Sequence, residues 1–141
     1  MDRDIYNPEG YPDPTAYQAL ANVAAQQRKQ MFRPVVYICS PYAGDTQRHT
    51  ADARRFCRFA VDSGAIPLAP HLLLPQFMDD ASADERELAM FMDLVLLTKC
   101  AELWVFGDAI SPGMAREIRK AEARNMQIRY FTTECKEDVH Q

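Results

Sequence analysis

Two carboxylates stand in sequence contexts that suit chemistry. Glu117 lies in the second turn of a helix predicted to begin after Ser111, and Gly113, one turn before it on the same side, has no side chain. Space is therefore expected above this carboxylate, close to the positive end of a helix, where a small ligand can bind. Asp93 is the only charged residue in LAMFMDLVLL, and a lone buried carboxylate is costly unless it is hydrogen-bonded or paired. We expect Asp93 to point into a polar cleft.

Each candidate also has a plainer structural interpretation. Glu117 falls on the border between the apolar and charged faces of its helix, so the alternative is a surface carboxylate paired with Lys120. For Asp93, the alternative is a helix side that faces solvent. His71 lies in a loop between prolines and is either close to a site or an ordinary loop residue. Ser111 is either a ligand contact or the helix cap, and these two roles can coexist.

Short apolar runs alternate with helical patterns along most of the chain. The predicted strands cover residues 34–40, 65–69, 102–106 and 127–131, and the predicted helices cover 46–63, 82–99 and 112–124. This alternation indicates a single Rossmann-like or flavodoxin-like α/β domain, with a parallel sheet of about four to five strands flanked by helices and the first strand central. Ligands bind such sheets beyond the carboxyl ends of the strands, which are expected at 40–45, 69–71 and 107–111.

Local signals mark where the helices begin and end. Ser111-Pro112 is a strong helix start, because the hydroxyl caps free N–H groups and proline at the first position loses no bond. The acidic sequence SADERE opens the helix at 82. Gly64 and Asn125 are expected to close the helices that precede them.

The domain organisation is predicted from the same signals. Residues 1–33 form an N-terminal arm with a helix from about Asp13-Pro14 to Met31, residues 34–131 form the α/β domain, and residues 132–141 are a polar tail expected to fray. The arm is expected to pack on the domain or on a second subunit.

Composition narrows the classes of partner and compartment. The 141 residues are 48% hydrophobic and 26% charged, with a net charge of −4 and no basic run, so a nucleic-acid polymer is not an expected partner. The longest apolar run, 88–97, is too short to span a bilayer, and the N-terminus does not read as a signal peptide. The four cysteines are far apart, which favours free thiols in a reducing cytoplasm.

Several well-known sites have no counterpart in the sequence. There is no GxxxxGK[ST], no GxGxxG after the first strand and no GxSxG. His49, His71 and His140 lack the spacing of metal ligands, so no metal site is predicted.

Four motifs, taken in order, resemble a known family. VYICSPYAGD is similar to a first strand and substrate loop, IPLAPHLLLP to the second strand and its loop, MDLVLLTKCAELWVFG to an aspartate-bearing helix and the strand after it, and SPGMAREIRKA to a helix with a catalytic glutamate. Together they resemble the nucleoside 2-deoxyribosyltransferase superfamily, which includes 2′-deoxynucleoside 5′-phosphate N-hydrolases and CMP nucleosidases. The nearest likeness is to its often phage-borne DUF4406 branch. The resemblance covers about Pro34 to Phe131.

The resemblance implies cleavage of an N-glycosidic bond without a metal or an organic cofactor. Glu117 would be the nucleophile that captures an oxocarbenium-like sugar, and Asp93 would hydrogen-bond the sugar or assist proton transfer. Water as acceptor gives a hydrolase, and a second base gives a transferase. The expected substrate contacts are Ser40, Tyr42, Gly44, Arg48, His71, Ser111, Gly113 and Met114.

The substrate expectation rests on Ser111, six residues before Glu117. Members acting on free nucleosides tend to carry aspartate there, and members acting on 5′-monophosphates tend to carry serine. An aspartate repels a phosphate, whereas a serine hydroxyl at a helix start donates to it beside free N–H groups. A nucleoside 5′-monophosphate is therefore favoured, with Ser40, Gly44 and Arg48 as further phosphate contacts.

Other functions fit the same pattern. The fold can serve a non-catalytic nucleotide-binding sensor or sponge, a base-exchanging deoxyribosyltransferase, or an accessory protein with a vestigial pocket. The resemblance also implies a homo-oligomer, at least a dimer, with the arm 1–33 or the helix 82–99 at the interface.

Overall fold

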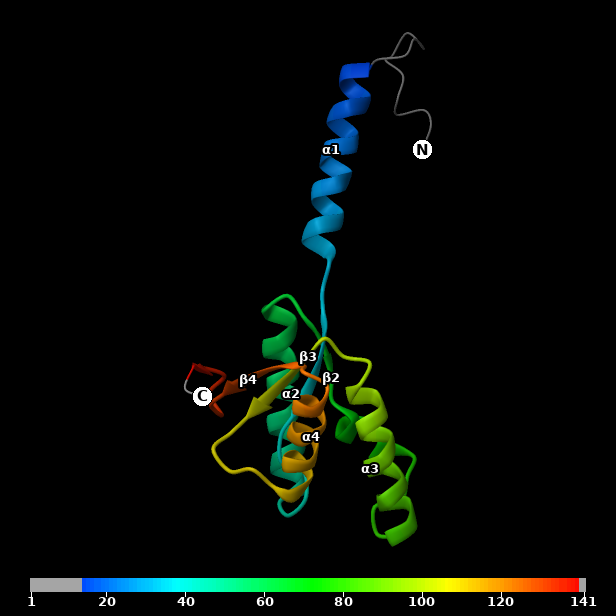
Figure 1. Cartoon of the computed structure of the whole chain (residues 1–141), viewed down its shortest axis with the longest axis vertical. Coiled ribbons are helices and arrows are strands. Elements are labelled where there is room, and N and C mark those ends of the chain that lie inside the picture. The colour runs from blue at the N-terminus through cyan, green and yellow to red at the C-terminus, as the bar shows by residue number, and fades with distance from the viewer. Residues whose placement is uncertain (1–13, 140–141) are drawn as a thin grey trace. The chain divides into compact units, whose positions relative to one another are not determined.

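The computed structural model describes residues 14–139, and the chain divides into two compact units, Met1–Phe32 and Arg33–Gln141 (Figure 1). The first unit contains helix α1 (Pro14–Met31), at the position predicted from the sequence. Proline suits the first turn of a helix because the N–H it lacks would have no partner there. The irregular arm predicted for residues 1–13 lies outside the described residues. No helix within 14–139 is long and apolar enough to cross a membrane.

The second unit is built on one mostly parallel sheet. Its strands are β1 (Val35–Cys39), β2 (Ile66–Leu68), β3 (Glu102–Phe106), β4 (Gln127–Phe131) and β5 (Glu137–Asp138), in the spatial order β2-β1-β3-β4-β5. The first four pair in parallel, and β5 pairs antiparallel to β4. The predicted fold class is confirmed. β1 was expected at the centre and is an interior strand, but β3 is the middle one.

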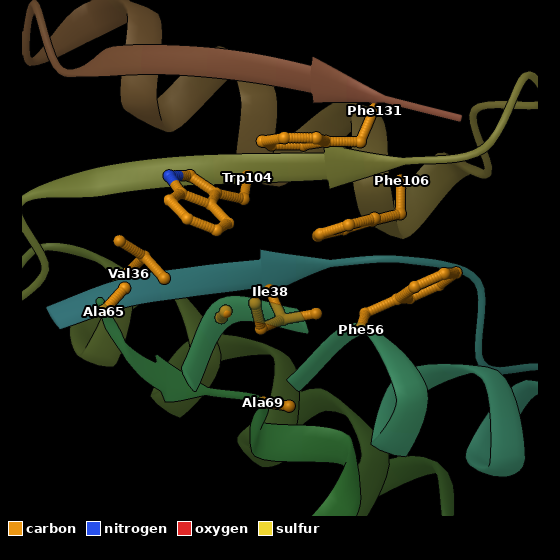
Figure 2. Packing of buried hydrophobic residues seen from close by; sticks show 9 residues of the cluster. Val36, Ile38, Phe56, Ala65, Ala69, Trp104, Phe106 and Phe131 are labelled. Atoms are coloured by element: carbon orange, nitrogen blue, oxygen red, sulfur yellow. The ribbon is translucent and has the colours of Figure 1, made fainter. Parts of the chain in front are cut away.

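Alternate side chains of the strands fill two apolar layers, as period-two geometry requires. One layer joins Phe56 of α2 (Thr46–Asp62) to Trp104, Phe106 and Phe131 of the sheet (Figure 2). The stacked rings of Phe56 and Phe106 lie 4.3 Å apart. Burying one such ring stabilises the fold by roughly 1.5–3 kcal/mol, so this layer is a main source of stability.

The opposite layer fixes the helices that carry the candidate residues. It joins Tyr37, Cys39, Leu103 and Val105 of the sheet to Met114 and Ala121 of α4 (Pro112–Ala123) and to Leu97 of α3 (Ala83–Leu97). Two short 3₁₀ turns, Pro70–Leu72 and Leu74–Gln76, lead from β2 towards α3.

Side-chain caps set the helix starts. Asp45, Ser82 and Ser111 accept hydrogen bonds from the backbone N–H three residues on, at 3.2, 3.3 and 3.2 Å. Each cap satisfies one of the N–H groups that a helix start leaves without a partner. At the other end of α4, Asn125 adopts a positive φ of 56°, which is typical of the residue that terminates a helix.

The polar tail differs from the sequence prediction. It was expected to fray, yet residues 137–138 form β5 against Tyr130 and Phe131. Arg129 donates to both carboxylate oxygens of Glu137 at 2.7 and 2.8 Å, and its guanidinium lies 4.8 Å from the centroid of Trp104. This bidentate pair holds β5 against the sheet, although the composition of residues 132–141 alone does not predict a strand.

Candidate active site

A cavity of about 370 Å³ lies at the carboxyl ends of the first two strands. Its wall is formed by the loops after β1 and β2, one side of α3 and the first turns of α4. It is lined by most of the predicted site residues, namely Ser40, Tyr42, His71, Asp93, Ser111, Gly113, Met114 and Glu117. Parallel strands end at the same edge of a sheet, which is why residues far apart in the chain meet here.

Glu117 extends from α4 towards β1. The hydroxyl of Tyr37 donates to Glu117 Oε2 at 2.6 Å, and no salt bridge within residues 14–139 joins Glu117 to Lys120. Burial raises the pKa of Glu117 to about 7, opposed by hydrogen bonds from Tyr37 and Cys39. Burial and the nearby Glu117 charge raise the pKa of Tyr37 far above its usual range, so this phenol stays protonated and remains a donor.

Asp93 faces the same cavity from α3. Its Oδ1 atom is buried and has no hydrogen-bond partner in the part of the chain that the structure describes. Burial raises the pKa of Asp93 to about 6, and the Asp93 charge in turn adds to the raised pKa of Glu117. A buried polar atom without a partner is uncommon in folded proteins and needs an explanation such as a ligand. Asp93 thus lines a cavity, and the prediction that this cavity is a polar ligand cleft stays a prediction.

His71 forms part of an aromatic wall. Its Nε2 lies 3.3 Å from Ser40 Oγ, and its ring stacks on that of Tyr42 with centroids 5.5 Å apart. Burial, together with a smaller contribution from the charge of His49, lowers the pKa of His71 to about 4, so the imidazole is neutral at physiological pH. Because Ser40 is buried, its contact with His71 holds the His71 ring in place as a surface on which the ring of a ligand can stack.

The start of α4 leaves open space beside Glu117. A Cβ atom at Gly113 would lie 4.0 Å from Ser111 Oγ and would touch no other side chain apart from those of its chain neighbours. The Ser111 hydroxyl accepts from the N–H of Met114, so it is a helix cap, and it keeps its own proton to donate. Met114 lines the cavity but is only 2% exposed and belongs mainly to the core.

Two predicted contacts do not reach the cavity. Gly44 is outside its lining and adopts a positive φ of 91° in the turn after β1. The Arg48 side chain is 75% exposed and pairs with Asp52 at 3.9 Å, one turn further along α2. Arg48 was chosen for its closeness in sequence to the loop, but the first turn of α2 directs its side chain to solvent.

The site also contains residues that were not predicted from the sequence. Tyr37 is one of them, although a tyrosine in a buried strand signals a hydroxyl that needs a partner. Arg86 and Arg116 line the cavity, together with the acidic residues Asp79, Asp80 and Glu85. Arg116 follows directly on Ala115 in the predicted helix 112–124, and only the fold shows that it lines the cavity.

The comparisons with known proteins agree with this architecture. The fold and site define a flavodoxin-like α/β protein with a carboxylate-centred pocket at the carboxyl ends of its strands. The chain belongs to the family DUF7768, a domain of unknown function, whose model matches residues 34–131. The DUF4406 branch suggested by the motifs stays a prediction. No curated protein matches the chain.

A solved structure shows the same fold at low sequence identity. The 2-deoxyribosyltransferase from the psychrotolerant bacterium Bacillus psychrosaccharolyticus is 17% identical and superposes with a TM-score of 0.56. The match covers 76% of this chain and 77% of that one. At this identity the likeness establishes the fold, and the activity has to be argued from the site.

The raised pKa of Glu117 predicts a pH-dependent stability. Below pH 4.5, the pKa of this carboxyl in the unfolded chain, the carboxyl is protonated in both the folded and the unfolded state. As the pH rises through about 7, the folded protein loses the part of its stability that depends on keeping Glu117 protonated. Glu117→Gln should therefore raise the free energy of unfolding by about 2–3 kcal/mol at about pH 8 and by far less at about pH 5. Urea denaturation at both pH values measures this. Glu122→Gln, on the exposed side of the same helix, is the control, and an equal effect at both pH values would contradict the prediction.

Proposed function

We propose that this protein cleaves or transfers the N-glycosidic bond of a nucleoside 5′-monophosphate or a nucleoside, with Glu117 as the nucleophile. The observation that carries the proposal is the position of Glu117, buried in a cavity, hydrogen-bonded by Tyr37 at 2.6 Å and facing the same space as the unpartnered Asp93. The shared fold with a 2-deoxyribosyltransferase supports this choice of chemistry.

The mechanism needs only side chains of this chain. The ionised Glu117 attacks the anomeric carbon, the bond from that carbon to the base nitrogen breaks, and the electron pair leaves with the base. Asp93, whose pKa of about 6 lets it hold or release a proton, hydrogen-bonds the sugar or passes a proton to the departing base. Water or a second base then displaces Glu117 from the sugar ester.

The wall of the cavity supplies contacts for each part of a nucleotide. The rings of Tyr42 and His71 offer a stacking surface for the base. The Ser111 hydroxyl and the free N–H groups at the start of α4 suit a phosphate. Arg116 lines the same cavity, and we assign to it the phosphate contact that was first predicted for Arg48.

A second candidate is base exchange on free nucleosides. Asp79, Asp80 and Glu85 line the cavity in addition to the two central carboxylates, and this acidic lining disfavours a phosphate dianion. A non-catalytic nucleotide sensor would bind its nucleotide in the same cavity.

All four cysteines are free, which fits our proposal that the protein works in the reducing cytoplasm.

The test is a panel of ribonucleosides, deoxyribonucleosides and their 5′-monophosphates, with free base measured by chromatography. We expect base release from monophosphates, and Ser111→Asp should shift the preference towards nucleosides by about tenfold or more, because a carboxylate repels the phosphate. Ser111→Thr, which retains a capping hydroxyl, is the control. Faster cleavage of free nucleosides, or exchange without hydrolysis, would favour the second candidate. Thermal stabilisation by nucleotides without any base release would support the sensor.

A further inference from the structure

The charges around the cavity are predominantly negative. Its lining contains five carboxylates but only two arginines, Arg86 and Arg116, and none of these groups forms a salt bridge within residues 14–139. The imidazole of His71 adds no positive charge, because burial keeps it neutral. The cavity therefore stays net negative even when Glu117 and Asp93 are both protonated.

Three of the carboxylates form an acidic rim, namely Asp79 and Asp80 before α3 and Glu85 in its first turn. Hydrogen bonds hold this rim in place. The Asp79 N–H donates to Glu85 Oε1 at 2.9 Å, and the Ala81 N–H donates to Asp79 Oδ1 at 3.0 Å. The Asp80 carboxylate has neither a hydrogen bond nor a salt bridge to any residue within 14–139, so its charge is free to act on a ligand.

The acidic rim is close to the aromatic wall of the cavity. Burial and the charge of Asp80 raise the pKa of Tyr42, so the Asp80 carboxylate lies near enough to act on this phenol. The Tyr42 ring in turn stacks on His71, with centroids 5.5 Å apart. The face of a phenol ring attracts cations, and a nearby carboxylate adds to that attraction. One side of the cavity thus combines two features that recognise a flat cation.

We propose that the base of the substrate carries a fixed positive charge, as in a pyridinium nucleoside or an N7-alkylated purine nucleoside, and binds between Tyr42 and Asp80. This inference rests on the proposed function, because it names the substrate class of the same site. A flat cation is attracted by both the ring and the carboxylate, whereas a neutral base is attracted by the ring alone. A cationic base also offsets part of the repulsion between the acidic lining and a 5′-phosphate.

A cationic base suits the chemistry proposed for Glu117. As the Glu117 oxygen bonds to the anomeric carbon, the bond from that carbon to the base nitrogen breaks, and its electron pair cancels the positive charge of the ring. The base leaves as a neutral molecule, for which the negative cavity has less affinity. Water then displaces Glu117 from the sugar ester, and the proton of that water passes to Asp93.

The binding test compares nucleosides that differ in charge but little in shape. Nicotinamide riboside is paired with its neutral dihydro form, and 7-methylguanosine, in slightly acidic buffer that keeps it cationic, is paired with guanosine. Isothermal titration uses the full-length Glu117→Gln variant, which prevents turnover. We expect the cationic member of at least one pair to bind about tenfold or more tightly at low salt, and the ratio to fall as salt is added. The pair with the larger ratio identifies the base as a pyridinium or a purine.

Two substitutions in the same variant locate the recognition. Asp80→Asn should weaken binding of the cationic member by about threefold and change that of the neutral member by less than about twofold. Tyr42→Leu should weaken binding of the cationic member by about fivefold or more. Asp84→Asn is the matched control, since Asp84 is an exposed carboxylate in the first turn of α3 that does not line the cavity. Circular dichroism melting verifies that each variant is folded.

Equal affinities within both pairs would overturn the proposal, as would a preference for the cation that survives both substitutions. Base release by the wild type separates this inference from the proposed function. Release from neutral nucleosides or their monophosphates alone would leave the proposed function standing and overturn the cationic substrate. A preference for the cation without base release from any compound would support the recognition of charge and count against the proposed cleavage.

Discussion

Replacing Glu117 with glutamine is expected to lower the rate of base release by about 10⁴-fold or more, as loss of a covalent nucleophile does in other enzymes. Glutamine retains an oxygen that can accept the hydrogen bond from Tyr37, so the geometry around it is preserved. It cannot form the sugar ester, because the amide is a poor nucleophile. Single-turnover kinetics with the preferred substrate, with free base measured by chromatography, gives the ratio.

The stability prediction separates loss of chemistry from loss of fold. The inactive variant should be more stable than the wild type at about pH 8, because it removes the cost of an ionised carboxylate in a buried position. An inactive and unfolded variant would leave the catalytic role without support. A variant with full activity would refute Glu117 as the nucleophile.

Replacing Asp93 with asparagine is expected to reduce the rate of base release by about 10²-fold, the size of effect that proton transfer by a positioned side chain usually has. Asparagine has nearly the same shape and needs no ionisation in a position where burial raises the carboxyl pKa to about 6. The protein should therefore remain folded. The same kinetic assay and a urea denaturation curve measure the two effects.

Glu87→Gln is the matched control for Asp93. Glu87 is an exposed carboxylate on the same helix and does not line the cavity. It should leave the rate unchanged within about twofold, because surface charges are only weakly felt at a distance in salt. An Asp93→Asn variant that unfolds would identify a structural aspartate, and one with normal activity would remove Asp93 from the mechanism.

The strands and helices follow closely from local sequence signals. The predicted strand at 102–106 and the Ser111-Pro112 helix start coincide with the observed elements because apolar alternation and capping chemistry act over a few residues. Strand β5 could not be predicted in this way. Its stability comes from pairing with β4 and from the bond between Arg129 and Glu137, which are eight residues apart.

The site was predictable where residues lie at strand ends or helix starts. Ser40, His71 and Ser111 meet because parallel strands end at one edge, and that rule is available from the sequence. The hydrogen bond from Tyr37 to Glu117 joins residues that are 80 positions apart in the chain. It could not be predicted, because it depends on which face of β1 the helix α4 covers. In the same way, the direction of the Arg48 side chain depends on how α2 is oriented, and the spacing of residues in the sequence does not give this orientation.

The two borders of the sheet have a consequence for how copies of this protein can meet. An open strand normally offers free N–H and C=O groups on which another strand can add. On one border, β2 has three residues and contains Pro67, which has no N–H to give. On the other, β5 has only two residues, and both of them, Glu137 and Asp138, are charged. Neither border is a good template for further strands, so the sheet resists growth into fibre-like stacks.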